Sequence, residues 1–306
     1  MVLLAADGVA IEAVYEPADV DADVTQDAAG RVPVTVVAHG FTGSAGRPHV
    51  RRAAAVFRRY GAVITFSFRG HGASGGRSTV GDREVLDLAA AVAWARRLGH
   101  RTVWTVGFSM GGSVVLRHAA LYPAGGRDAR GSAGVRDVQG SAGGRDVQGS
   151  AHADGQGSAH ADAHGSAHTD AHGPAHTDAV VAVSAPARWY YQGTAAMRRL
   201  HWVVTRPLGR AVGRYGLRTR IHTSDWDPVP LDPAEAAARI APTPLLLVHG
   251  DRDPYFPLDH PRALATAAGP HADLWLVPGM GHAENAADEA LLARIGAWAA
   301  RRAPGG

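Results

Sequence analysis

Six short apolar segments alternate with longer segments of helical periodicity, and this alternation restricts the possible folds more than any other feature of the sequence. The apolar segments lie at residues 33–38, 62–66, 102–107, 179–184, 245–249 and 273–277. Because they are apolar almost throughout, they are typical of strands buried on both faces of a parallel sheet. The helical segments lie at residues 51–60, 83–98, 109–121, 258–268 and 288–301. The alternation predicts an α/β fold with a doubly wound, mostly parallel sheet.

Antiparallel strands are expected at residues 2–5 and 9–15, at the edge of this sheet. A long segment, residues 124–178, interrupts the alternation and contains no Leu, Ile, Met or aromatic side chain. It repeats with a period of nine and then eight residues, and its Gly, Ser and Asp leave no apolar face. We therefore predict a disordered, low-complexity insertion at 124–178. The α/β core would comprise residues 1–123, 179–187 and 236–306, with a cap or lid at 188–235.

Histidines recur at every fourth position near the end of this repeat, at 160, 164, 168, 172 and 176. Such spacing can present two imidazoles to one metal ion on a helix. Glycines at 165 and 173 and Pro174 disfavour that helix, however, and no second set of ligands supports a site. We expect no functional metal site here.

Composition excludes several classes of protein. The chain has no cysteine, so disulfides, thiolate catalysis and cysteine-based metal sites are absent. Its 31 basic residues are all arginine and its net charge is only +3, with no recognisable nucleic-acid-binding module. The first residues lack a secretory signal pattern, and no run approaches the roughly 18 apolar residues of a membrane span. A cytoplasmic location without stable membrane insertion or nucleic-acid binding is expected.

Residues 188–230 combine eight arginines with Trp189, Tyr190, Tyr191, Trp202 and Tyr215. Basic and aromatic residues together can indicate a nucleic-acid or membrane surface. The alternative, which we favour, is a short helical cap whose aromatic side chains face a pocket while its arginines face water. Trp189, Tyr190 and Tyr191 are candidates for the pocket wall, and packing within the core or the cap is the equal alternative.

The most informative motif is Gly107-Phe108-Ser109-Met110-Gly111, which joins a predicted strand directly to a predicted helix. A serine at such a turn is held in a strained conformation, and small residues two positions away let the neighbouring backbone pass closely. The turn exposes the hydroxyl at the carboxyl edge of the sheet. Ser109 is therefore a candidate nucleophile.

A serine hydroxyl needs a base, and the base needs an acid that orients it. Asp251 and Asp253 follow the strand at 245–249, and His282 lies in a glycine-rich loop after the strand at 273–277. Active sites of open α/β sheets gather at this carboxyl edge. Serine, acid and histidine in this chain order match one type of catalytic triad.

The turn after the first long strand, His39-Gly40-Phe41-Thr42-Gly43-Ser44, offers backbone N–H groups that can stabilise an oxyanion. His39, His71 and His249 lie beside glycines at strand ends. We expect their imidazoles to fix loops by hydrogen bonding, and we assign none of them to proton transfer.

Five motifs, HGFTGS, FRGHGASGG, GFSMGG, HGDRDPYFP and PGMGH, follow one another in the order found in α/β-hydrolase fold enzymes, the family of serine esterases and lipases that this chain resembles. The resemblance implies Ser109 as the nucleophile, His282 as the general base and Asp253 as the acid. Asp253 is preferred to Asp251 because the acid of the family usually lies three residues after the strand-end glycine. The resemblance also implies an oxyanion hole formed by the N–H groups of Phe41 and Met110.

The expected activity is hydrolysis of a carboxylic ester through an acyl-serine, without a metal or organic cofactor and with a small acyl compound as the partner. A thioesterase or acyltransferase would use the same residues. A catalytically silent binding protein with this fold is a further alternative. The oligomeric state stays open.

Overall fold

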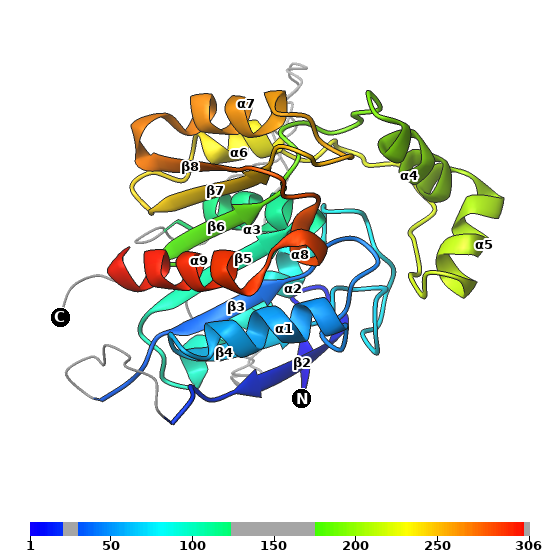
Figure 1. The fold of residues 1–306 in the computed structure, drawn as a ribbon. Helices are drawn as coiled ribbons and strands as arrows, with labels where there is room; N and C mark the ends of the chain where they lie inside the picture. The colour runs from blue at the N-terminus through cyan, green and yellow to red at the C-terminus, as the bar shows by residue number, and fades with distance from the viewer. Residues whose placement is uncertain (21–29, 124–174, 303–306) are drawn as a thin grey trace, which may run out of the picture.

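The computed structural model of the chain describes residues 1–20, 30–123 and 175–302. Eight strands of these residues form one sheet in the order β1-β2-β4-β3-β5-β6-β7-β8. The six strands from β4 to β8 in this order run parallel, while β1 and β2 pair antiparallel at the opposite edge (Figure 1). The strands are β1 (Val2–Leu4), β2 (Ala10–Glu16), β3 (Val34–Ala38), β4 (Ala62–Phe66), β5 (Val103–Phe108), β6 (Ala179–Val183), β7 (Leu245–Gly250) and β8 (Ala272–Val277). The predicted parallel strands and antiparallel edge are confirmed.

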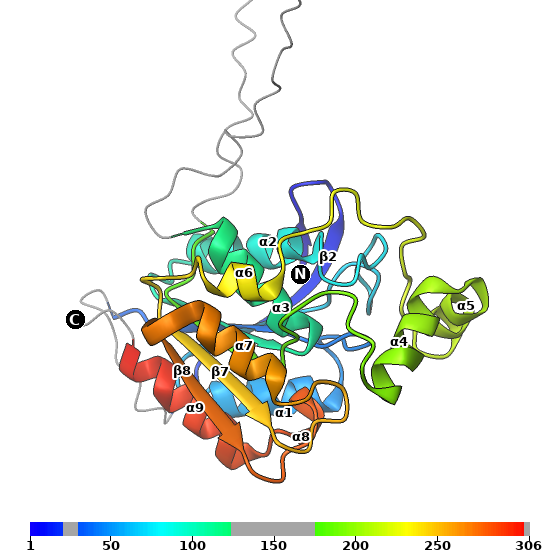
Figure 2. The same ribbon diagram turned by 90° about the horizontal axis from the view of Figure 1, so that it is seen from above.

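Helices cover both faces of the sheet, as Figure 2 shows from above. One face carries α1 (Pro48–Phe57), α8 (Ala283–Ala286) and α9 (Glu289–Arg302). The other carries α2 (Glu84–Arg97), α3 (Met110–Leu121), α6 (Pro233–Ala237) and α7 (Asp259–Ala268), which a 3-10 turn, Gly269–His271, joins to β8. The sheet is therefore doubly wound, and the predicted fold class is confirmed.

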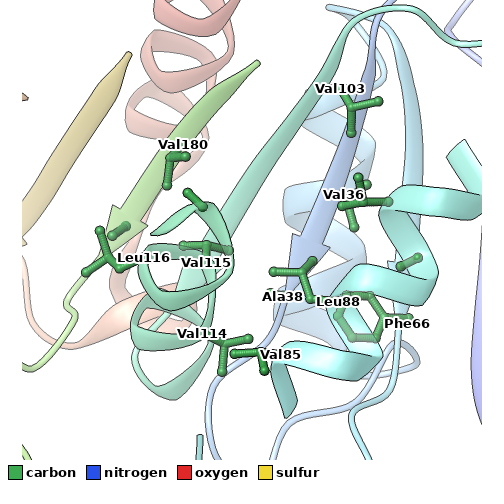
Figure 3. Packing of buried hydrophobic residues seen from close by; sticks show 14 of the residues in the cluster. Val36, Ala38, Phe66, Val85, Leu88, Val103, Val114, Val115, Leu116 and Val180 are labelled. Carbon is green, nitrogen blue, oxygen red and sulfur yellow. The ribbon is translucent and has the colours of Figure 1, made fainter. Parts of the chain in front are cut away.

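Successive residues of the central strands enter two separate hydrophobic clusters, because side chains alternate across a sheet. In β3, for example, Val36 and Ala38 pack toward α2 and α3, whereas Val37 packs toward α1. Figure 3 shows the first cluster, in which Val114 and Leu116 of α3 lie against this face. Burial on both faces explains why these strands read as continuous apolar runs. Each fully buried valine contributes about 1.5–3 kcal/mol through the hydrophobic effect.

The end of the predicted insertion differs from the sequence-based boundary. Residues 124–174 lie outside the described part of the chain, and with them four of the five regularly spaced histidines, but residues 175–178 are described. Thr177 is buried, and its hydroxyl donates to the carbonyl oxygen of Val103 at 3.1 Å. The Asp178 carboxylate accepts from the N–H of Val103 at 2.7 Å and from Arg96 at 2.8 Å. These residues therefore belong to the core, where they anchor the start of β6.

The predicted cap, residues 188–235, contains two complete helices, α4 (Ala195–Thr205) and α5 (Pro207–Tyr215), and its last three residues begin α6, which packs on the sheet. Thr194 caps α4 by accepting a hydrogen bond from the N–H of Met197 at 3.2 Å. Pro207 forces the helix to break, because proline lacks a donor and restricts the residue before it. Figure 1 shows both helices beside the end of the sheet where the parallel strands finish. We call residues 188–235 the cap segment.

None of the helices within residues 1–20, 30–123 and 175–302 combines the length and the apolar character needed to cross a membrane.

Candidate active site

Ser109 lies at a sharp turn between β5 and α3, and its φ of 52° is in the left-handed region that non-glycine residues rarely adopt. A Cβ atom at Gly107 would collide with the backbone of Gly111, and one at Gly111 would collide with the carbonyl oxygen of Ala38. The two glycines are therefore required by close backbone packing. The turn lies beside β3, where the chain order of the strands reverses, and such switch points form crevices in α/β sheets.

A chain of hydrogen bonds connects Ser109 with the two residues predicted downstream. Oγ of Ser109 lies 2.8 Å from Nε2 of His282, and Nδ1 of His282 lies 2.7 Å from Oδ2 of Asp253. An ionised carboxylate can only accept, so the imidazole proton is on Nδ1 and Nε2 can accept from the serine hydroxyl. The geometry therefore brings the three predicted residues together in an arrangement suited to proton transfer from Ser109.

The Asp253 side chain is fully buried. Its Oδ1 accepts from the N–H groups of Tyr255 at 2.8 Å and Phe256 at 3.1 Å. Burial alone would raise the pKa of this carboxyl, but the hydrogen bond from His282 and the two backbone donors outweigh it and leave the pKa lowered. Asp253 is therefore held in the ionised form that can orient the imidazole.

Asp251, the alternative acid, occupies a different position. It is exposed, and its Oδ1 accepts from the N–H of Gly279 at 2.7 Å. This hydrogen bond connects the loops that follow β7 and β8. Asp251 therefore stabilises the loops that carry Asp253 and His282.

The turn after β3 presents backbone donors beside Ser109. We find no acceptor for the N–H of Phe41 among the residues that the structure describes. Met110 is the first residue of α3, so its N–H precedes the first hydrogen bond within the helix. Both residues line the same cavity as Ser109. The N–H groups of Phe41 and Met110 are thus available to an anion bound at Ser109.

Two buried imidazoles hold this turn. The N–H of Phe68 donates to Nε2 of His39 at 3.0 Å, so Nδ1 carries the proton and donates to the carbonyl oxygen of Gly40 at 2.7 Å. Burial, together with the neighbouring His71, lowers the pKa of His39 to about 3, so it is neutral. His71 accepts from the N–H of Thr42 at 3.3 Å, and burial lowers its pKa as well. Both histidines fix the loop, as expected.

His249 has a comparable position in the loop that carries Asp253. Its Nε2 lies 2.8 Å from the carbonyl oxygen of Phe256, to which it donates. Burial lowers the pKa of this imidazole, which favours the neutral form. His249 therefore supports the acid-bearing loop by its hydrogen bond.

Glu284 is the residue at this site that the sequence analysis missed. Its buried carboxylate accepts from the N–H of Gly40 at 3.1 Å, immediately before Phe41. Arg52 fixes the same helix end by donating to the carbonyl oxygens of Glu284 at 2.8 Å and Ala287 at 2.7 Å. The only signal in the sequence is an acidic residue two positions after His282, since its contact with Gly40 spans almost the whole chain.

A cavity of about 230 Å³ opens above Ser109, between the sheet edge and the cap segment. Its wall is mainly apolar and aromatic and includes Val80, Trp189, Tyr190, Met197, Leu200 and Trp226. The indole of Trp226 packs edge-on against that of Trp189, with ring centres 5.1 Å apart. The cavity can enclose a small apolar or aromatic group next to Ser109.

The cap aromatics divide into two groups. Trp189, Tyr190 and Tyr191 line the cavity, as predicted. Trp202 and Tyr215 do not, and their exposed fractions are 44% and 78%. The expectation that the cap aromatics face the pocket is wrong for these two. Leu200 and Val204, which line the cavity, are each two residues away from Trp202 along α4. Because successive residues of a helix are about 100° apart around its axis, Trp202 lies on the opposite side of α4.

Comparison with known proteins agrees with this architecture. A family model described as the alpha/beta hydrolase fold matches residues 33–125. No curated protein sequence matches the chain. Among solved structures, the Pyrococcus furiosus esterase Pf2001 is 20% identical, with a TM-score of 0.62 over 100% of this chain and 92% of that one.

Two bacterial proteins are similar at comparable levels. A serine hydrolase of Xanthomonas campestris, described as lacking a lid, is 17% identical, with a TM-score of 0.56 over 100% of this chain and 95% of its own. Est1E of Butyrivibrio proteoclasticus, determined with ferulic acid bound, is 17% identical, with a TM-score of 0.52 over 98% of this chain and 96% of its own. The chain therefore has the α/β-hydrolase fold, as the resemblance of its five motifs implies.

Proposed function

We propose that the protein is a serine hydrolase that cleaves carboxylic esters through an acyl-serine intermediate. The observation that carries this proposal is the continuous chain of hydrogen bonds from Asp253 through His282 to Ser109. In this arrangement Ser109 is the nucleophile, His282 the general base and Asp253 the acid that orients the imidazole.

In the first half of the reaction, Oγ of Ser109 attacks the ester carbonyl carbon while Nε2 of His282 accepts the hydroxyl proton. The carbonyl oxygen of the tetrahedral intermediate becomes an anion, which the N–H groups of Phe41 and Met110 stabilise. Each such donor contributes about 3–4 kcal/mol to lowering the barrier. The intermediate collapses with cleavage of the bond to the leaving alcohol, and His282 returns its proton to the alcohol oxygen.

In the second half, water attacks the acyl group on Ser109. His282 accepts a proton from the water, a second oxyanion forms, and the carboxylic acid leaves as Oγ recovers the proton. These steps use only residues of the chain and one water molecule.

The cavity favours an acyl or alcohol group that is apolar and small. Its wall consists largely of indole, phenol and aliphatic side chains. Binding of an apolar group there is favourable, because it removes apolar surface of both the group and the wall from water. The similarity to the esterase Pf2001 of Pyrococcus furiosus favours an oxygen ester over a thioester or amide. A thioesterase or an acyltransferase, which would use the same three residues, is the second candidate.

A panel of p-nitrophenyl esters and acyl thioesters tests the proposal. We expect wild-type protein to hydrolyse short-chain p-nitrophenyl esters, with Ser109→Ala reduced by at least about 10³-fold. Thr105→Val, which removes a buried hydroxyl of β5 that does not line the cavity, is the control. Preference for thioesters would favour the second candidate. Absence of turnover on every substrate would favour a silent binding protein with this fold.

A further inference from the structure

The segment from residue 188 to residue 224 is strongly basic. It contains eight arginines and no aspartate or glutamate. Arg188 pairs with Asp259 at 2.7 Å, but Arg199, Arg206 and Arg218 are exposed and have no acidic partner within the described residues. The rest of the cap segment adds four acidic residues, Asp225, Asp227, Asp232 and Glu235, so the eight arginines leave the cap segment with a net positive charge.

Helix α5 exposes an apolar stripe as well. Leu208, Val212 and Tyr215 follow one another at helical spacing, and their exposed fractions are 67%, 44% and 78%. The residues of α5 that face inward are Gly209 and Gly213, which approach Val203 of α4 closely. The helix thus turns two glycines toward the protein and its large apolar side chains toward solvent, the reverse of a helix that packs on a core.

On the opposite side of α5, Arg210 and Arg214 lie one turn apart, and Arg206 immediately precedes the helix. Arg210 donates to the carbonyl oxygens of Val204 and Thr205 at the end of α4, whereas Arg206 and Arg214 are exposed. A helix with an apolar stripe on one side and arginines on the other is suited to lying in the plane of a lipid bilayer surface. Apolar side chains enter the boundary between head groups and acyl chains, while the guanidinium groups reach anionic head groups.

We propose that the outer surface of α4 and α5 docks on an anionic lipid surface. Charge complementarity favours this occupant over a second copy of the chain, because two such surfaces, each basic and without acidic residues, repel one another. The apolar stripe favours lipid over nucleic acid, since phosphates offer nothing that Leu208 and Val212 would contact. Trp202, on the outer side of α4 with Arg198 and Arg199, extends the same surface.

The docking surface adjoins the cavity. Helix α4 lines the cavity with Met197 and Leu200 on its inner side and carries Trp202 on its outer side. Docking on a bilayer would therefore bring the cavity close to apolar molecules dissolved in the bilayer. The proposal concerns binding alone, so it does not depend on the identity of the reaction at Ser109.

Co-sedimentation with vesicles tests the proposal. We expect full-length protein to bind vesicles of phosphatidylcholine and phosphatidylglycerol in equal parts, and to bind pure phosphatidylcholine vesicles far more weakly. The variant Arg206→Gln/Arg214→Gln should bind about 30-fold more weakly, since each arginine near an anionic surface contributes about fivefold. Arg51→Gln/Arg97→Gln, which removes two exposed arginines elsewhere, is the matched control and should bind like wild type.

Leu208→Ser/Tyr215→Ser tests the apolar stripe. Neither residue lines the cavity, so thermal stability and ester turnover in solution should stay unchanged while vesicle binding falls at least tenfold. Equal binding to neutral and anionic vesicles, or cap variants that bind like the control, would overturn the proposal. So would DNA binding that exceeds vesicle binding at equal phosphate concentration, or a dimer in solution that Leu208→Ser/Tyr215→Ser dissolves.

Discussion

Replacing Asp253 by asparagine should abolish most activity while leaving the fold intact, for a reason that follows from three hydrogen bonds. Oδ1 accepts from the N–H groups of Tyr255 and Phe256, so the amide oxygen of asparagine stays at that position. The NH₂ group must then face Nδ1 of His282, at the site where Oδ2 lies 2.7 Å from the ring. A donor at this place moves the imidazole proton to Nε2, which can no longer accept the proton of Ser109.

The size of the rate loss in Asp253→Asn depends on the free-energy cost of the opposite orientation of the asparagine amide. Turning the amide round would restore the productive tautomer, but it would place the NH₂ group against two backbone donors. Each unsatisfied buried donor costs about 1–3 kcal/mol, so the productive arrangement is disfavoured by about 2–6 kcal/mol. A rate loss of about 30-fold to 10⁴-fold is expected, because 1.36 kcal/mol corresponds to a factor of ten.

The assay is kcat/KM on a p-nitrophenyl ester together with thermal unfolding. Asp253→Asn should lose activity with a small change in melting temperature, whereas Asp253→Ala should also lose stability, because two N–H groups then lack an acceptor. Asp251→Asn is the matched control, because Asp251 accepts a hydrogen bond from the N–H of Gly279. This variant should keep activity within about threefold of wild type. Asp253→Asn with more than about a tenth of wild-type activity, or Asp251→Asn with an equal loss, would refute the reasoning.

Three further predictions concern other parts of the molecule. Glu284→Gln keeps an acceptor for the N–H of Gly40 and should retain most activity. Glu284→Ala removes the acceptor and should lower kcat about 10- to 100-fold with little change in KM. Equal effects of the two substitutions would contradict a role of Glu284 in positioning the turn that carries the N–H of Phe41. Burial lowers the pKa of His118 to about 3, so below pH 6.5 the unfolded chain binds a proton that the folded chain does not, and stability falls as the pH falls. Urea unfolding should show wild type losing about 2 kcal/mol more than His118→Leu between pH 8 and pH 5, and parallel losses would contradict this. Deletion of residues 124–174 should leave a folded protein with unchanged ester turnover, and a soluble, folded deletion variant without activity would show that the segment has a function.

The elements that bear the chemistry could be predicted because each is encoded locally. Continuous apolar runs such as residues 34–38 report burial on both faces of the sheet. Gly107 and Gly111 indicate a tight turn around Ser109, because the backbone contacts at both positions leave no room for a Cβ atom. The loops after β7 and β8 meet at one edge of the sheet because the strands are parallel, so Asp253 and His282 could be predicted to lie close together. The preference for Asp253 over Asp251 came from the family resemblance.

What could not be predicted depends on contacts between distant parts of the chain. Glu284 meets Gly40 only after the whole sheet has formed, and nothing in its neighbourhood distinguishes it from a surface acid. The tetrapeptide His-Thr-Asp-Ala occurs at 168–171, outside the described residues, and again at 176–179, where Thr177 and Asp178 are bonded to β5, so local sequence cannot mark where the core resumes. Trp202 and Leu200 are two residues apart on one helix yet face solvent and cavity, respectively, which composition cannot reveal.

The central claim, that Ser109 is a nucleophile activated by His282 and Asp253, is tested most directly by covalent labelling with a fluorophosphonate. Intact mass spectrometry of the wild-type protein should show one adduct, and fragmentation of the labelled peptide should assign it to Ser109. Labelling should be lost in Ser109→Ala and strongly slowed in His282→Ala, since the hydroxyl then lacks a base. An unlabelled wild-type protein, or an adduct that persists in Ser109→Ala, would contradict the account.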